Sequence, residues 1–241
     1  MADLRLDKLV AQAADLPRSQ ARRAILAGRV MLDGAVCRRP DQKVEQTARL
    51  TLDGDPLRWE EHLYLMVNKP AGVLSASRDP HQQTVVDLVR DRYPRRELFP
   101  AGRLDKDSTG FVLLTDDGAL AHALLSPRHH VEKVYKVTLD LPADEKMQRG
   151  FADGVTLADG ERMLPARLEI EAEDPTCVTV VLHQGVYHQI KRMFGVFGAG
   201  VCTLHRSAIG PVRLDPQLAP GQSRPLTEQE LKSLREAAGE K

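Results

Sequence analysis

The sequence predicts an α+β protein in which a small module of two helices and a β-hairpin precedes a larger domain built on a β-sheet. Apolar residues recur at helical spacing near the N-terminus, and an Asp-Gly pair follows them. Further along, short β-branched and aliphatic runs alternate with glycine, proline and aspartate, as in strands joined by turns. The 241 residues suffice for a small domain joined to a medium one. We place the boundary in the polar segment 53–62 and predict domains at residues 1–59 and 60–241.

The first module begins with two amphipathic helices. Apolar residues lie on one face over residues 4–14 and again over residues 18–28, where Gly28 is the expected stop. The outward face of the second helix carries Arg18, Arg22 and Arg23. Asp33-Gly34 then separates two short apolar runs, which predicts a hairpin with a type I′ turn.

The larger domain contains strand and helix patterns in alternation. Strands are predicted at residues 63–67, 111–115, 134–139, around 163–170, 177–182, 201–204 and 209–214. Helices are predicted at residues 84–89, 119–126, about 144–151 and 187–197. Thr227 and Glu230 have the spacing of a capping box, so we expect a last helix from there to about Ala237.

Charge is balanced overall but segregated along the chain. Lys and Arg number 34, as do Asp and Glu. Residues 18–43 hold seven Lys or Arg against two acids, and residues 183–213 hold four Lys or Arg and three His with no acid. Residues 140–174 carry ten acids and four bases. This separation predicts basic surfaces for a polyanion. The three cysteines lack metal-site spacing, and with no hydrophobic signal core or long apolar run we expect a cytoplasmic protein with no membrane association.

The stretch from Gly102 to Gly118 concentrates polar groups beside a predicted core strand. Its loop packs arginine, lysine, two aspartates, serine and threonine into seven positions, 103–109, ahead of the strand at 111–115. A rigid strand can hold such groups in place, so Asp105 is the candidate working residue. Spacing alone favours a simpler interpretation, in which the loop is a solvated turn whose Asp and Thr cap backbone amides.

The sequence of this loop, GRLDKDSTGF, resembles motif II of the RNA pseudouridine synthases, and in particular of their RsuA branch. The resemblance implies that Asp105 is the catalytic aspartate. NKPAG at 68–72 resembles motif I, where Lys69 is either a loop or phosphate contact or part of a structural turn. K-V-Y, ending at Tyr135, resembles the motif that holds the active-site tyrosine.

Two further stretches extend the resemblance over most of the chain. HQIKRM at 188–193 resembles motif III, which implies that Ile190 packs the pocket of the aspartate and that Lys191 pairs with its carboxylate. The superfamily often has arginine there, and lysine gives a point charge in place of a bidentate fork. The pattern from Leu6 to Gly34 resembles the S4 RNA-binding domain. An S4 domain followed by a catalytic domain with a mixed, mainly antiparallel sheet and flanking helices is therefore the expected fold.

The implied reaction converts uridine to pseudouridine without a cofactor or metal. Asp105 would act at the ribose as nucleophile or base, and Tyr135 would stack on the uracil or assist proton removal. Arg103 would fill the gap left by the extruded base. The basic residues expected to bind RNA, besides Arg103 and Lys69, are Arg18, Arg22, Arg23, Arg128 and Arg192.

The motifs look most like the synthase of 16S ribosomal RNA, free or in a small-subunit assembly intermediate, and we expect a monomer. Three alternatives stay open: the same chemistry on 23S rRNA or tRNA, a catalytically silent S4-type RNA-binding protein, and a glycoside hydrolase. The last would pair Asp105 with Asp107 or Asp116. It is disfavoured because sugar sites display aromatic platforms and this chain is only 4% aromatic.

Overall fold

The computed structural model describes residues 4–45, 48–57, 59–126 and 128–240. Its contacts divide the chain into two compact units. The N-terminal unit comprises Met1–His62 with Arg92–Arg95, and the C-terminal unit comprises Leu63–Asp91 with Arg96–Lys241. The boundary predicted between residues 59 and 60 lies just ahead of this division.

The N-terminal unit packs two helices, α1 (Leu6–Ala13) and α2 (Arg18–Leu26), with a small sheet. The sheet has the order β3 (Ala35–Val36), β2 (Val30–Leu32), β5 (Leu50–Leu52) and β6 (Asp55–Leu57), while β1 (Leu4–Arg5) pairs separately with β4 (Lys43–Val44). The apolar helix faces predicted from the sequence form the core of this unit.

The predicted hairpin is confirmed, and a second one accompanies it. Asp33 and Gly34 both have positive φ, 49° and 84°, as a type I′ turn requires. Asp53 and Gly54 also have positive φ, 54° and 92°, and they join β5 to β6. The sequence analysis interpreted this second Asp-Gly pair as part of a linker. Pro56 obscured the strand, because proline is tolerated only on an edge strand, and β6 is at the edge of its sheet.

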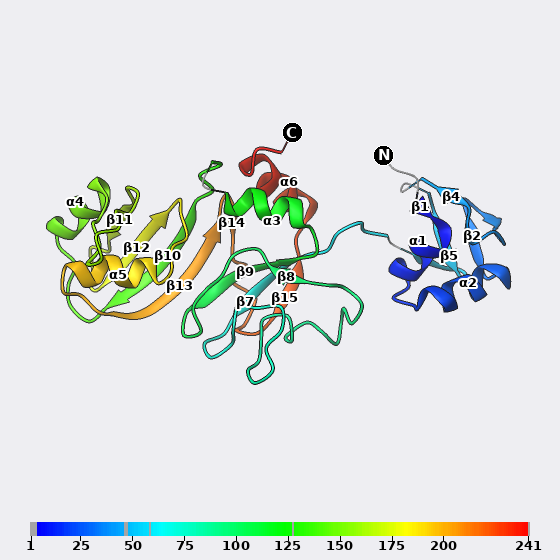
Figure 1. Ribbon diagram of the computed structural model, residues 1–241, viewed down its shortest axis with the longest axis horizontal. Helices are drawn as coiled ribbons and strands as arrows, with labels where there is room; N and C mark the ends of the chain where they lie inside the picture. The colour runs from blue at the N-terminus through cyan, green and yellow to red at the C-terminus, as the bar shows by residue number, and fades with distance from the viewer. Residues whose placement is uncertain (1–3, 46–47, 58, 127, 241) are drawn as a thin grey trace. The chain divides into compact units, whose positions relative to one another are not determined.

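The C-terminal unit is built on one nine-stranded sheet (Figure 1). The main order is β11 (Arg167–Ile170), β12 (Cys177–Leu182), β10 (Lys133–Leu139), β13 (Val201–Ile209), β9 (Thr109–Thr115), β7 (Tyr64–Lys69) and β15 (Ser223–Pro225). Short strands β14 (Val212–Arg213) and β8 (Phe99–Pro100) pair with β13 and β9. Only β13 and β9 pair in parallel among these ladders, so the predicted mixed, mainly antiparallel sheet is confirmed.

Helices flank the sheet at both ends. In Figure 1, α3 (Gly118–Leu125) and α6 (Glu228–Ala237) lie side by side over the half that contains β7 and β9, and α4 (Glu145–Asp153) and α5 (Gln189–Val196) lie over the other half. Phe111, Leu113 and Leu120 belong to the buried cluster beneath α3 and α6. Within the described ranges, none of the helices combines the length and apolar character needed to cross a membrane.

One predicted helix is wrong and another begins later than expected. Thr84 forms an isolated β-bridge with Leu74, and residues 85–89 form turns closed by backbone bonds three residues apart, from the amide of Asp87 to Thr84 and from the amide of Val89 to Val86 at 3.1 Å, in place of α-helical bonds. Helix α5 begins at Gln189, so Tyr187 lies ahead of the helix and is 70% exposed.

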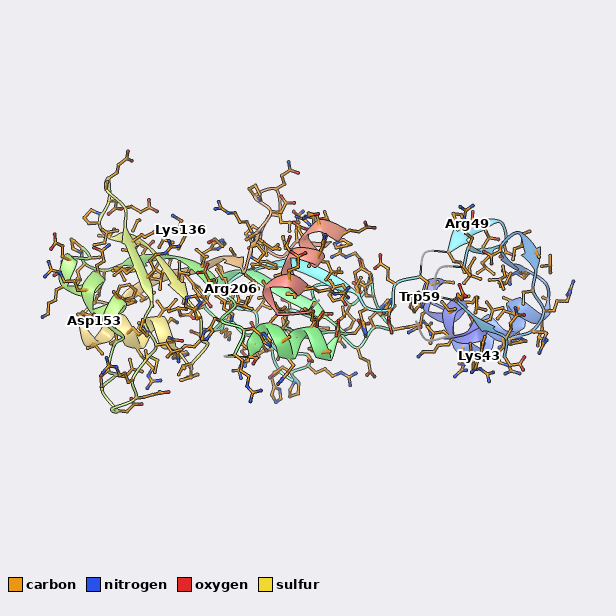
Figure 2. All side chains as sticks on the ribbon, turned by 90° about the horizontal axis from the view of Figure 1, so that it is seen from above. Lys43, Arg49, Trp59, Lys136, Asp153 and Arg206 are labelled. Atoms are coloured by element: carbon orange, nitrogen blue, oxygen red, sulfur yellow. The ribbon has the colours of Figure 1, made fainter. Side chains whose placement is uncertain are left out.

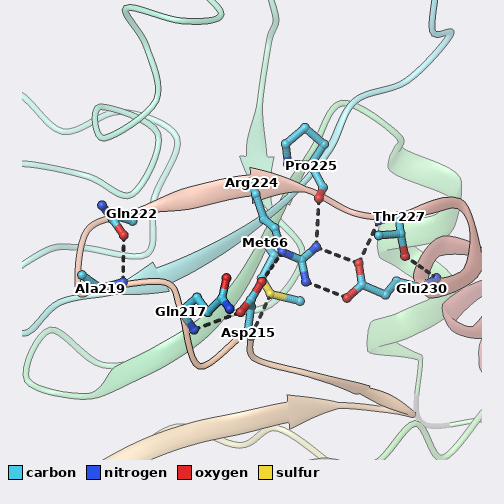
Figure 3. Close-up of polar contacts among 9 residues, drawn as sticks. All are labelled: Met66, Asp215, Gln217, Ala219, Gln222, Arg224, Pro225, Thr227 and Glu230. Carbon is cyan, nitrogen blue, oxygen red and sulfur yellow. Dashed lines mark hydrogen bonds and ion pairs between the residues drawn. The ribbon is translucent and has the colours of Figure 1, made fainter.

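The last helix is fixed to the edge of the sheet by a polar network (Figure 3). The capping box between Thr227 and Glu230 is present as predicted. Arg224 of β15 donates two hydrogen bonds of 2.8 Å to Glu230 and one of 2.7 Å to Asp215. This network links the edge strand to the start of α6.

The two halves of the sheet meet where β13 approaches β9. Their parallel pairing covers only His205 opposite Thr109 and Arg206 opposite Gly110. Gly110 has a φ of 101°, and a Cβ added to it would lie 2.8 Å from the backbone nitrogen of Arg206 and closer still to its carbonyl oxygen. A side chain at position 110 would therefore push the two strands apart.

We expect Gly110→Ala to lower the free energy of unfolding of the C-terminal unit by about 3 kcal/mol or more, because it adds both a steric clash and backbone strain. Urea unfolding followed by circular dichroism measures the change. Gly118→Ala is the matched control, since that helical glycine has nothing within 4 Å of an added Cβ and its change should stay within about 1 kcal/mol. Equal unfolding midpoints for wild type and Gly110→Ala would contradict the argument.

Candidate functional site

A cavity of about 480 Å³ lies in the C-terminal unit, beside the junction of the two sheet halves. The loop before β9, strands β10 and β13, and the segment leading into α5 contribute its walls. The predicted site residues Arg103, Asp105, Tyr135 and Ile190 all line it. Positions far apart in the sequence thus reach one concave site of a size suited to a small ligand.

The loop that carries Asp105 is held by hydrogen bonds on both sides. The amide of Gly72 donates to the carbonyl of Lys106 at 2.8 Å, and the amide of Leu104 donates to the hydroxyl of Ser75 at 3.0 Å. The turn itself is closed by the amide of Ser108, which donates to the carbonyl of Asp105 at 3.1 Å. The loop before β9 is therefore a supported element and not a freely solvated turn.

Lys69 lies beneath this loop and does not contact solvent. Its side chain has 0% exposure, and its ammonium donates to the carbonyls of Pro70, Lys106 and Ser108 at 3.0, 3.1 and 2.6 Å. Burial lowers the pKa of Lys69 to about 8, although the charges of Asp107 and Asp105 oppose the shift. Of the roles considered for Lys69, these contacts agree with the structural one, because the three donors of the ammonium already hold the loop and leave none for an RNA phosphate.

Asp105 is partly exposed to the cavity and faces two bases. Its side chain is 24% exposed, and its two carboxylate oxygens lie 3.5 Å from Nε2 of His188 and 3.5 Å from Nζ of Lys191. Lys191 makes closer contacts with Asp107, at 2.8 and 2.7 Å. Burial lowers the pKa of Lys191, but Asp107 and then Asp105 outweigh burial and leave it raised. The ammonium is thus shared between two carboxylates, with Asp107 nearer.

Tyr135 and Ile190 form buried walls of the cavity, with exposures of 8% and 3%. Tyr135 lies in β10 and faces Arg206 of β13 in the antiparallel register. Arg103 is exposed at the same cavity.

Three basic residues of the cavity lining were not predicted as site residues: His188, Lys133 and Arg206. His188 has a left-handed backbone, with φ of 50° and ψ of 31°, and it precedes α5. Both His188 and Lys133 lie inside motifs that were quoted for other residues, HQIKRM and K-V-Y. The structure buries Lys133 and Arg206, with exposures of 8% and 3% (Arg206 is labelled in Figure 2). Strand alternation around Tyr135 predicts that Lys133 shares its face.

Two other predicted RNA contacts lie outside the cavity lining. Arg192 forms ion pairs with Asp159 and Glu161, and its side chain is 28% exposed. Its charge is therefore partly neutralised by the acidic segment in the free protein. Arg128 is exposed, and its amide donates to the hydroxyl of Ser126 at 3.3 Å.

Comparisons with known proteins agree with this geometry. Residues 63–195 match the family model described as RNA pseudouridylate synthase, and residues 4–50 match that of the S4 domain. A Bacillus subtilis protein described as an uncharacterized RNA pseudouridine synthase is 44% identical over 97% of this chain and 99% of its own length. The chain belongs to the RNA pseudouridylate synthase family.

Other relatives of the synthase support the same assignment. The ribosomal small subunit pseudouridine synthase A of Escherichia coli is 42% identical over 96% of this chain and 100% of its own length. A crystal structure of a pseudouridylate synthase is 40% identical, covers 96% of this chain and 99% of its own, and superposes with a TM-score of 0.68. The resemblance found in the motifs is confirmed, both for the S4 domain and for the catalytic domain.

The glycoside hydrolase alternative finds no support in the synthase. Asp116 accepts hydrogen bonds from the amide of Leu63 and from Arg96, and Asp107 is bound to Lys191. Among the described residues, neither of these carboxylates lines the cavity that contains Asp105.

The S4 domain of the synthase organises its arginines around a buried carboxylate. Asp7 is 1% exposed and lies 3.0 Å from Arg5, 2.9 Å from Arg18 and 3.7 Å from Arg22. These arginine side chains remain 44–55% exposed. Burial by itself raises the pKa of Asp7, but hydrogen bonds from Arg5 and Arg18 outweigh it and hold the pKa at about 2. Arg23 lies in α2 with Arg18 and Arg22 and is exposed as well.

We expect Asp7→Asn to lower the free energy of unfolding of the S4 domain by on the order of 2 kcal/mol at pH 7, since the folded-state pKa is about 2 against an ordinary 3.8. The ionised Asp7 stabilises the fold above about pH 4, and this contribution disappears as the pH falls towards 2. The difference between wild type and variant should shrink over that range.

Fluorescence of Trp59, the single tryptophan, follows urea unfolding of this domain in the full chain (Figure 2), because Trp59 packs against its core. The matched control is Asp53→Asn, which removes an exposed ion pair with Arg29 and should change the midpoint little. A pH-independent difference for Asp7→Asn would contradict the electrostatic argument.

Proposed function

We propose that this synthase converts a specific uridine of 16S ribosomal RNA to pseudouridine, with Asp105 as the catalytic residue. The observation that carries the proposal is the cavity: it brings Asp105, Tyr135 and Ile190 together from three elements that are separate in the sequence, and Lys191 lies 3.5 Å from Asp105. The 16S target rests on the relatives named as ribosomal small subunit pseudouridine synthases.

Asp105 has the position that either form of carboxylate chemistry needs. Asp105 lines the cavity, and its oxygens lie 3.5 Å from Nζ of Lys191 and from Nε2 of His188. The buried face of Tyr135 and the apolar side chain of Ile190 offer a dry surface on which uracil can stay bound after its glycosidic bond breaks. This chemistry uses side chains alone, and we propose that it needs no cofactor or metal.

Access for a nucleotide requires that the base leave its stack. A cavity lined by buried residues cannot receive a base that is still stacked in RNA, so we propose that the uridine is flipped out. Arg103 is exposed at the cavity and is placed to fill the vacated position or to bind the neighbouring phosphates. The S4 domain would add affinity through Arg18, Arg22 and Arg23. We propose that the synthase acts as a monomer.

We expect wild-type protein to release tritium from 16S RNA labelled at C5 of uridine, and Asp105→Asn to lower the rate by about a thousandfold or more while still binding RNA, because the amide is neither nucleophile nor base. Single-turnover tritium release and filter binding measure the two properties. Asp116→Asn is the control; its amide oxygen can still accept from Leu63, and its activity should stay within about tenfold of wild type.

The alternatives give different results in the same assay. Release from 23S RNA or tRNA but not from 16S RNA, free or in small-subunit particles, would correct the substrate. Tight RNA binding without release from any of them would favour a silent S4-type binding protein. Equal loss of activity in Asp105→Asn and Asp116→Asn would contradict the assignment of a single catalytic aspartate.

A further inference from the structure

The inner wall of the cavity contains two buried cations that the chemistry above does not use. Lys133 and Arg206 both line the cavity and are 8% and 3% exposed. Within the part of the chain that the structure describes, neither forms an ion pair with a carboxylate. The ammonium of Lys133 makes one hydrogen bond, to the carbonyl of Leu124 at 3.3 Å. A buried charge normally has a partner, so two in one wall call for an explanation.

Arg206 lines the cavity and has one side-chain nitrogen without a hydrogen-bond partner. Its Nε donates to the carbonyl of Phe111 at 2.7 Å, and its Nη1 donates to the carbonyl of Arg103 at 3.5 Å. These bonds fix the guanidinium, whereas Nη2 is buried with no hydrogen-bond partner. An unsatisfied buried donor costs free energy in the unbound protein, which indicates that a ligand atom completes it.

Strand geometry places both cations beside the tyrosine of the site. Lys133 and Tyr135 are two apart in β10 and share its buried face, while Lys136 points to the exposed face. Arg206 is the register partner of Tyr135 across the β10–β13 ladder. A ring that stacks on Tyr135 would therefore lie close to both Lys133 and Arg206.

The burial pattern identifies the base, and not a backbone phosphate, as the group that these cations meet. The cavity residues Arg103 and Tyr187 are exposed, so the RNA backbone passes on their side. Lys133, Tyr135 and Arg206 are among the buried residues of the lining, where a flipped base can reach and a backbone phosphate cannot. Uracil presents carbonyl oxygens that accept hydrogen bonds from such donors.

We propose that Arg206 and Lys133 stabilise the negative charge that develops on the uracil when its bond to the ribose breaks. The inference rests on the proposed function and extends it to the departing base. When the N1–C1′ bond breaks, its electron pair stays on N1, so the uracil leaves as an anion whose charge is shared with the O2 and O4 oxygens. The ribose is completed either by a bond from an Asp105 oxygen to C1′ or by transfer of the C2′ proton to Asp105.

The second half of the reaction returns this charge. The uracil anion turns in the cavity and its C5 forms a bond to C1′, while the bond from Asp105 to C1′ breaks or, on the other route, the C2′ proton returns from Asp105. The C5 proton is then lost to a base, and N1 gains a proton. Atoms and charge balance, because product and substrate are isomers. Fixed cations at the inner wall favour the separated anion more than the neutral uridine, which lowers the barrier to bond cleavage.

The state of Lys133 fits this role. Burial, reinforced by the charge of Arg206, lowers the pKa of Lys133 to about 8, so the ammonium form still predominates at pH 7. A buried ammonium with one weak hydrogen bond destabilises the free protein. A lysine that destabilises the free protein is expected at such a position when its charge contributes to the reaction.

The decisive variant is Lys133→Met, which keeps an unbranched side chain but removes the charge. The control is Lys136→Met on the opposite face of β10, where the lysine is exposed and paired with Glu171 at 2.6 Å. Single-turnover loss of the N-linked nucleoside is measured by nuclease digestion and mass spectrometry on a 16S fragment that contains the position modified by wild type, with uridine or 5-fluorouridine there. This readout follows cleavage of the N1–C1′ bond and needs no hydrogen at C5. Fluorine makes the departing uracil a more stable anion and thus less dependent on the cations.

We expect Lys133→Met to lower the maximal rate on uridine by about a hundredfold, with RNA affinity and melting temperature kept or raised. On 5-fluorouridine the deficit should shrink to about tenfold or less. Lys136→Met should match wild type on both RNAs. Arg206→Gln should repeat the pattern of Lys133→Met; should it fail to fold, Lys133→Met still decides the question.

Three results would overturn the inference while the proposed function stands: a wild-type rate for Lys133→Met, an equal deficit on both RNAs, or weaker RNA binding with an unchanged maximal rate, which would indicate a phosphate contact. Absence of pseudouridine formation by wild type would instead overturn the proposed function, and the inference with it.

Discussion

The two halves of the catalytic sheet meet at Gly110 and Arg206, where β9 and β13 pair in parallel for only two residues. One half carries the Asp105 loop, and the other carries Tyr135 and leads to α5. Arg206 reinforces the junction from its side chain, because its guanidinium bonds the carbonyls of Phe111 and Arg103. The glycine permits backbone contact at the point where the halves must approach, so the distance across the cavity depends on this contact.

The two lysines beside the Asp105 loop, Lys69 and Lys191, differ in burial and therefore in the groups that they bind. Lys69 is fully buried and donates three hydrogen bonds to backbone carbonyls, which supports the loop. Lys191 is 26% exposed and lies between Asp107 and Asp105. A cation shared by two carboxylates gives each a weaker attraction than a bidentate pair would, so Asp105 keeps an accessible oxygen for chemistry.

The sequence predicted the fold and much of the site because its local patterns and motifs are strong. Alternation, turn residues and the capping box located most elements, and the motifs led to Asp105, Tyr135 and Ile190 in one cavity. Burial was harder to predict. Nothing in the local pattern around Lys69 distinguishes an enclosed lysine from a surface one, because the carbonyls that surround it come partly from a loop almost 40 residues away. The ion pairs of Arg192 with the acidic segment likewise depend on tertiary packing.

The cations of this enzyme that form ion pairs with carboxylates differ in their role from the cations that do not. Arg18 and Arg22 are anchored by Asp7, and Arg192 is anchored by Asp159 and Glu161, so these side chains are positioned before RNA arrives. Such cations are positioned at little cost and contribute through exposed surface. Arg206 and Lys133 have no carboxylate partner among the described residues, although they are far more buried. Unlike Lys69, whose three donors are used by backbone carbonyls, these two cations lie in the cavity wall, and the free energy that their burial costs in the unbound state is recovered when the proposed anion forms beside them.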